Sequence, residues 1–166
     1  MRKVLFLDFD GVICTPATDF CIDASKLDML EQIVAATNCD IVISSSWRRY
    51  TLDKTIAYIT DSKRHYVEGN PFRPVDKVID ITSRMYAFKY GDADKHYKVP
   101  RGVEIDRWLK EHKDEVSTYC IVDDAADMLL CQAKNFVQTD CMTGLTDDDV
   151  HNIIRILNDS DNKQNS

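Results

Sequence analysis

Two aspartates stand two positions apart at the end of an apolar run near the N-terminus. In VLFLDFDGVI, residues 4–13, Asp8 and Asp10 follow four apolar residues and precede Gly11. A carboxylate is costly to bury unless a partner or a metal ion compensates its charge. The pair therefore indicates a site built at the end of a buried strand.

Polar residues also follow two later apolar runs. IVISSS places Ser44 and Ser45 after one run, and CIVDD places Asp123 and Asp124 after another. Up to four carboxylates in one small volume would repel one another, and their pKa values would rise unless a cation lay among them. Oxygen ligands with room for water suit Mg²⁺, which usually takes one or two protein carboxylates together with substrate phosphate.

The remaining residue types at these strand ends suit a phosphate group. A serine hydroxyl can donate a hydrogen bond to a phosphate oxygen. Gly11 marks a turn where the backbone approaches a ligand closely, and its N–H group and those just before it are candidate donors. Carboxylates, hydroxyls and backbone donors together indicate a phosphoryl site.

Strands and helices that alternate along the chain must position these residues. The predicted strands cover 3–8, 40–45, 75–82, 117–123 and 135–140, and the predicted helices cover 23–37, 47–60, 102–114, 125–134 and the segment from Thr146 on. This alternation predicts an α/β fold, a doubly wound parallel sheet wrapped by helices on both faces. Ligands of such sheets bind at the carboxyl ends of the strands, near a switch in strand order.

The length of 166 residues predicts a single domain over 1–158, with a small irregular insertion at about 61–100 and a disordered tail at 159–166. About fifty residues between 49 and 100 are too few for a large cap over the site. We therefore expect a minimal cap and an open site, which suits a macromolecular phosphate or a small substrate completed by a partner surface.

Charge and cysteine content narrow the class of protein. The net charge of −7 argues against extended nucleic-acid binding through a basic surface, although a local phosphate site remains compatible with it. No apolar run reaches the length of a membrane span, and the N-terminal run is too short and acidic for a secretory signal. Six cysteines without a CxxC pair are typical of a reducing compartment, so we expect a cytoplasmic protein.

Three motifs, LDFDGVI, IVISSSW and CIVDDAAD, resemble in order the first, second and fourth motifs of the haloacid dehalogenase-like (HAD-like) superfamily of aspartate-nucleophile phosphohydrolases. The resemblance implies that Asp8 is the nucleophile that forms an aspartyl-phosphate and that Asp10 is the general acid and base. It also implies Mg²⁺ held by Asp8, by the main-chain carbonyl of Asp10 and by Asp123, with Asp124 close to the ion or acting through water.

The same resemblance implies a hydroxyl and a cation that bind the phosphoryl group. The hydroxyl belongs to Ser44 or Ser45, and strand length slightly favours Ser45. The third motif usually supplies a lysine, and in KVPRGVEIDRWL we place Arg101 first and Lys98 second. An arginine departs from the usual pattern, but it offers a permanent charge and two parallel donors. Asp127 either orients Arg101 or the water around the metal, or is a simple first-turn helix acid.

Two residues just past the second predicted strand are further candidates for substrate binding. Arg48 is placed to contact phosphate. Trp47 suits either stacking on a base or packing, whereas Trp108 lies on the apolar side of its predicted helix and is expected in the core.

A narrower resemblance covers nearly the whole chain. SSSWR, RGVEIDRWL, the VDD strand and VQTDCMTGLTDDD are similar to the HAD domain of Swiss Army Knife-type RNA repair proteins, and less closely to the 3′-phosphatase part of phage polynucleotide kinase-phosphatase. We therefore predict a Mg²⁺-dependent phosphohydrolase of phosphomonoesters, whose substrate is a phosphorylated small molecule, a nucleotide or a nucleic-acid end. The alternative is a non-catalytic domain that binds Mg²⁺ and phosphate in an interaction or regulatory role. The Asp8/Asp10 pair favours the enzyme, and the absence of an obvious third-motif lysine favours the alternative.

Overall fold

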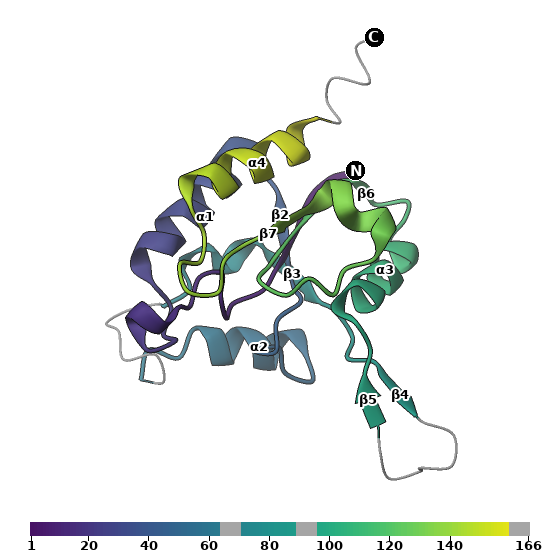
Figure 1. Cartoon of the computed structure of the whole chain (residues 1–166), viewed down its shortest axis with the longest axis horizontal. Helices are drawn as coiled ribbons and strands as arrows, with labels where there is room; N and C mark the ends of the chain where they lie inside the picture. The colour runs from purple at the N-terminus through teal and green to yellow at the C-terminus, as the bar shows by residue number, and fades with distance from the viewer. Residues whose placement is uncertain (64–70, 89–95, 160–166) are drawn as a thin grey trace.

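The computed structural model describes residues 1–63, 71–88 and 96–159 (Figure 1). Within this part of the chain, five parallel strands form one sheet in the order β3-β2-β1-β6-β7. Their bounds are β1 Arg2–Leu7, β2 Asp40–Ile43, β3 Val78–Ile81, β6 Val116–Asp123 and β7 Phe136–Gln138. The predicted α/β fold with a doubly wound parallel sheet is confirmed.

Helices cover both faces of this sheet, as the alternation of strand side chains requires. Leu5 and Leu7 of β1 belong to the core cluster under α1, α2 and α4, whereas Val4 and Phe6 belong to the cluster under α3. Figure 1 shows α1 and α4 lying side by side. The bounds are α1 Ala24–Thr37, α2 Leu52–Ile59, α3 Arg101–Glu111 and α4 Asp147–Asn158, with 3₁₀ turns at η1 Pro16–Thr18, η2 Arg73–Lys77 and η3 Leu130–Asn135.

Capping side chains explain where the helices begin. The Asp23 carboxylate accepts a hydrogen bond from the Ser25 N–H at the start of α1. At α4, the hydroxyl of Thr146 and the carboxylate of Asp149 form a reciprocal capping box, which confirms Thr146 as the predicted cap. The predicted helix over 47–60 begins only at Leu52, because a turn follows β2 and the first capping side chain is Thr51.

The strand order reverses between β1 and β6, and this reversal is where a ligand site of such a sheet is expected. The chain moves outward from β1 to β2 and β3, then crosses back to β6 on the other side of β1. Leu7 pairs with Ile43 of β2 and with Val122 of β6. The residues one position further on, Asp8, Ser44 and Asp123, therefore lie level with one another at the carboxyl edge of the sheet, which is the expected ligand position.

The segment predicted as helical over 125–134 is different in the structure. Only the 3₁₀ turn η3 is helical, and the residues before it are held in an irregular path. The Asp123 carboxylate accepts from the Ala125 N–H, and the Asp127 carboxylate and carbonyl accept from the N–H groups of Arg101 and Gly102. The bonds of Asp127 tie the segment to the start of α3, so this acidic residue does not begin a helix of its own.

The insertion expected at about 61–100 contains an integral strand of the sheet, β3. What departs from the sheet is the antiparallel hairpin of β4, Tyr86–Phe88, and β5, His96–Lys98, which projects from the body of the molecule (Figure 1). Residues 64–70, 89–95 and 160–166 lie outside the described residues, and with them most of the predicted tail. Among the helices described, none has the length and apolarity needed to cross a membrane.

Candidate active site

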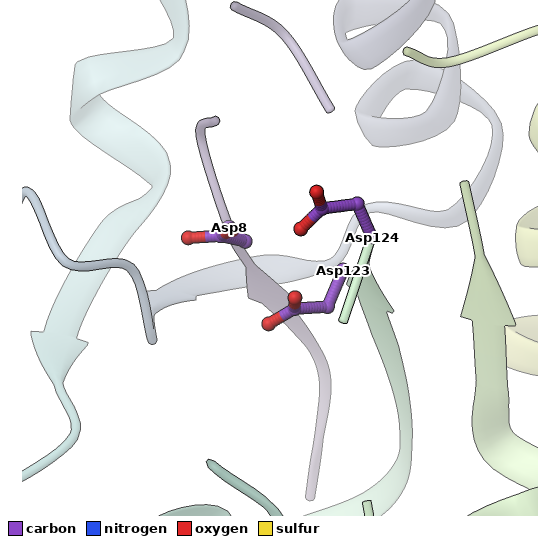
Figure 2. A group of neighbouring side chains, drawn as sticks. All are labelled: Asp8, Asp123 and Asp124. Carbon is purple, nitrogen blue, oxygen red and sulfur yellow. The ribbon is translucent and has the colours of Figure 1, made fainter. Parts of the chain in front are cut away.

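Three carboxylates gather at the carboxyl ends of β1 and β6. Asp8, Asp123 and Asp124 each offer an oxygen within 4.8 Å of the others (Figure 2). Asp8 and Asp123 are buried, and Asp124 is partly exposed. Burial, together with the neighbouring charge of Asp8, raises the pKa of Asp123 to about 7 and raises the pKa of Asp124 as well.

This cluster fits a hard divalent cation. The donors are all carboxylate oxygens, and Oδ2 of Asp123 is buried without a hydrogen-bond donor in the described chain. A cation among these oxygens would reduce their mutual repulsion and would give Oδ2 of Asp123 a partner. Mg²⁺ prefers such oxygen ligands. The carboxylate of Asp10 is outside the cluster, and coordination by its main-chain carbonyl stays a prediction.

Arg101 is the cation that pairs with these carboxylates in the described part of the chain. Its Nη1 lies 3.3 Å from Oδ1 of Asp8 and 3.5 Å from Oδ2 of Asp123, and it also donates to the carbonyl of Ser44. Burial alone would lower the pKa of Arg101. The negative charges of Asp8 and Asp123 outweigh burial, so the pKa is raised overall. Arg101 is the first residue of α3, and the Asp127 carboxylate accepts from its backbone N–H at 2.8 Å. Asp127 thus holds the helix start that carries the guanidinium.

The two serines after β2 have different surroundings. Ser44 is level with Asp8, and its buried hydroxyl has no hydrogen-bond partner in the described chain. The hydroxyl oxygen of Ser45 accepts from the N–H of Trp47 at 3.1 Å. This bond leaves the Ser45 O–H available to donate, so the preference for Ser45 from strand length stays a prediction. We favour Ser44 as the donor to a phosphoryl oxygen, because it is level with Asp8 and its hydroxyl has no other partner in the described chain; β2 ends at Ile43, two residues earlier than predicted.

Asp10 lies outside the cluster of three carboxylates, and the loop after β2 orients its side chain. The Trp47 indole N–H donates to Oδ1 of Asp10 at 2.9 Å, and the Ser46 hydroxyl donates to Oδ2 at 3.3 Å. The indole is itself fixed, stacked on Phe9 at a centroid distance of 5.1 Å and edge-on to Tyr58. Trp47 therefore both packs and contacts the site, two roles that the sequence presents as alternatives.

Gly11 serves the site differently from the prediction. Its N–H donates to the carbonyl of Cys14 at 2.7 Å, so it is not a free donor for phosphate. Its φ of +73° favours glycine, and a Cβ here would lie 2.5 Å from Oδ2 of Asp124. Gly11 is needed because the turn passes directly against the Asp124 carboxylate.

Arg48, predicted as a phosphate ligand, lies in a buried network behind the site. Its guanidinium pairs with Glu104 of α3 and donates to the carbonyl of Ser44 at 2.5 Å and to the hydroxyl of Thr82 at 2.7 Å. Glu104 also accepts from the backbone N–H of Met85. Burial lowers the pKa of Arg48, and the charge of Glu104 opposes that effect. We assign Arg48 a structural role, because both of its terminal nitrogens donate to these protein acceptors.

Lys98 does not contact the carboxylates, so Arg101 has the position that the third motif requires. Lys98 lines a small cavity next to the site together with Arg84. Sequence reasoning missed Arg84, because it lies in an irregular segment after β3 with no motif around it. It also missed Glu104, whose partner Arg48 is distant along the chain. Trp108, by contrast, is in the core as predicted, edge-on to Phe6.

Comparison with known proteins agrees with this geometry. Residues 4–150 match the family model described as the HAD domain in Swiss Army Knife RNA repair proteins. No curated protein and no solved structure matches the chain significantly. The matched range contains all three strand-end motifs and the start of α3. The chain therefore belongs to the family of HAD domains in Swiss Army Knife RNA repair proteins.

Proposed function

We propose that this domain is a Mg²⁺-dependent phosphohydrolase that cleaves phosphomonoesters through an aspartyl-phosphate on Asp8. The observation that supports the proposal most strongly is the difference between the surroundings of Asp8 and those of Asp10. Asp8 lies with Asp123 and Asp124 beside Arg101, whereas Asp10 is held separately by Trp47 and Ser46. A nucleophile and a proton donor need such different surroundings.

The chain's own residues support two balanced steps. An oxygen of Asp8 attacks phosphorus, the ester P–O bond breaks, and Asp10 gives its proton to the leaving oxygen. Asp10 then takes a proton from water, which attacks the aspartyl-phosphate and releases inorganic phosphate with Asp8 restored. The Arg101 guanidinium and the Ser44 hydroxyl orient the phosphoryl group. Mg²⁺, when bound by Asp8, Asp123 and Asp124, would neutralise charge so that the carboxylate can approach phosphate.

Phosphorylated small molecules, nucleotides and nucleic-acid ends are all candidate substrates. The family's place in RNA repair proteins favours a nucleic-acid end. The overall negative charge favours recognition of the end alone, because an acidic surface would repel a long polyanion.

The proposal is tested by hydrolysis of p-nitrophenyl phosphate with Mg²⁺ and with EDTA. We expect turnover by the wild type with Mg²⁺, and loss of that turnover in EDTA and in Asp8→Asn. Asp114→Asn is the matched control, because Asp114 is exposed near the opposite edge of the sheet. If the wild type and Asp8→Asn are equally inert across a broad panel of phosphate esters, the non-catalytic alternative replaces the proposal.

A further inference from the structure

A cavity of about 220 Å³ adjoins the carboxylate site on the side of α3. It shares two residues with that site. Arg101 lines the cavity and also contacts Asp8, and Ser46 lines it while its hydroxyl bonds to Asp10. A substrate whose phosphate lies at Asp8 would therefore have the cavity next to it.

Arg84 is fixed at the wall of this cavity. One of its terminal nitrogens, Nη2, donates to the carbonyls of Ser46 and Arg48 at 2.8 and 2.9 Å. Both acceptors are neutral, and no carboxylate in the described residues pairs with Arg84. The guanidinium is thus positioned by the backbone after β2 while its charge remains uncompensated, and its other nitrogens remain available to an anion.

Lys98 adds a second cation from β5, and it likewise has no carboxylate partner in the described part of the chain. The two acidic residues of the cavity wall are already engaged. Glu104 pairs with Arg48, and Asp127 accepts from the N–H of Arg101. The lining holds four cationic side chains against these two acidic ones, so the cavity carries a positive surplus on a protein with a net charge of −7.

We propose that Arg84 and Lys98 form a second-anion subsite, so that the preferred substrate is a phosphomonoester carrying a second phosphate group. This inference rests on the proposed function and specifies its substrate class. The cavity is smaller than the roughly 300–1,000 Å³ of sites that enclose a whole ligand. It suits one small charged group. Arg84 contacts the loop after β2 and not Asp8, so its anion is distinct from the phosphate that is cleaved.

The kinetic test compares a nucleoside 3′,5′-bisphosphate with the matching 3′- and 5′-monophosphates. We expect wild-type kcat/KM to be at least about tenfold higher for the bisphosphate, the size of effect that one or two charged hydrogen bonds supply. Arg84→Ala and Lys98→Ala should each reduce this ratio several-fold. Arg155→Ala, which removes one exposed charge from α4, should leave the ratio unchanged. A wild-type ratio of kcat/KM for bisphosphate over monophosphate near one would overturn the proposed subsite. So would a ratio that neither Arg84→Ala nor Lys98→Ala changes.

A binding test separates this proposal from the proposed function. Asp8→Asn is titrated calorimetrically with the bisphosphate and with a monophosphate, with and without Arg84→Ala in the same chain. We expect Arg84→Ala to weaken the bisphosphate about tenfold and the monophosphate little. Arg84-dependent binding without hydrolysis by the wild type would reject the enzyme and keep the subsite. If the wild type hydrolyses the phosphoester but Asp8→Asn binds the bisphosphate equally with and without Arg84→Ala, the enzyme is kept and the subsite is rejected. Arg84 is exposed, so its variant is expected to fold, and its melting temperature checks this.

Discussion

The indole N–H of Trp47 donates a 2.9 Å hydrogen bond to the carboxylate of Asp10. This bond joins the loop after β2 to the loop after β1, and stacking on Phe9 keeps the indole in place. Asp10 is thereby oriented by an aromatic ring that packs against the core. An aspartate that must give up and take back a proton at one position benefits from such fixed orientation.

Trp47→Phe should preserve the stacking and remove the donor. We expect kcat to fall about 5- to 30-fold for an alkyl phosphate and less for p-nitrophenyl phosphate, because only the poor leaving group needs a well-placed proton. The ratio of the two rates is the measurement. Trp108→Phe is the matched control, because it removes an indole hydrogen bond to Asp80 elsewhere. Equal losses for both substrates would show that Trp47 is only structural.

Removing the Arg101 side chain should impair catalysis more than folding. Arg101→Ala deletes the donor next to Asp8, and loss of one such donor typically lowers the rate about 10²- to 10³-fold. Arg101→Lys should recover part of the activity, because an ammonium group keeps the charge but not the planar pair of donors. Arg107→Ala, on the exposed side of the same helix, is the control. Activity of Arg101→Ala within threefold of the wild type would contradict the assignment.

The buried pair of Arg48 and Glu104 should couple strongly in stability. Glu104→Leu leaves an uncompensated buried guanidinium and should lower the free energy of unfolding by about 3–5 kcal/mol. Arg48→Met leaves the opposite charge and should also be destabilising. Replacing both residues should cost less than the sum of the two single changes. Urea unfolding measures all three variants, and additivity to within about 0.5 kcal/mol would disprove the coupling.

The raised pKa of Asp123 predicts how the metal-free protein responds to pH. Its folded pKa of about 7 lies above the value of about 3.9 for an unfolded aspartate, so the folded state keeps a proton that the unfolded state releases. The free energy of unfolding should therefore fall as pH rises between these values, with the contribution complete below about pH 4 and lost above about pH 7. Between pH 5 and 8 the loss is of order 2–3 kcal/mol, at about 1.4 kcal/mol per unit.

Urea unfolding in EDTA at pH 5 and pH 8 tests this expectation. Asp123→Asn cannot titrate and should show a smaller difference between the two conditions. Added Mg²⁺ should stabilise the wild type more at pH 8 than at pH 5, because it binds ionised carboxylates. The same pH dependence in both proteins would mean that Asp123 is not the group responsible.

The strand ends could be predicted from sequence, because buried apolar runs followed by acids identify both the sheet and its functional edge. Asp8 and Asp123 converge for that reason alone. The contact of Trp47 with Asp10 and the pairing of Arg48 with Glu104 could not be predicted. They depend on how loops and α3 pack over the sheet, which no local pattern encodes. The prediction of a helix over 125–134 is wrong for a related reason, since the carboxylate of Asp127 accepts from the start of α3 and does not begin a helix of its own.

The most direct test of the account is to trap the phosphoryl group on Asp8. Asp10→Asn is mixed with p-nitrophenyl phosphate and Mg²⁺, quenched in acid and analysed by peptide mass spectrometry. The good leaving group lets the first step proceed, while the second step lacks its base, so a phosphoryl adduct should accumulate on the peptide that contains Asp8. Asp8→Asn should give no adduct. Continued turnover without an adduct on Asp8, or an adduct on another residue, would contradict the account.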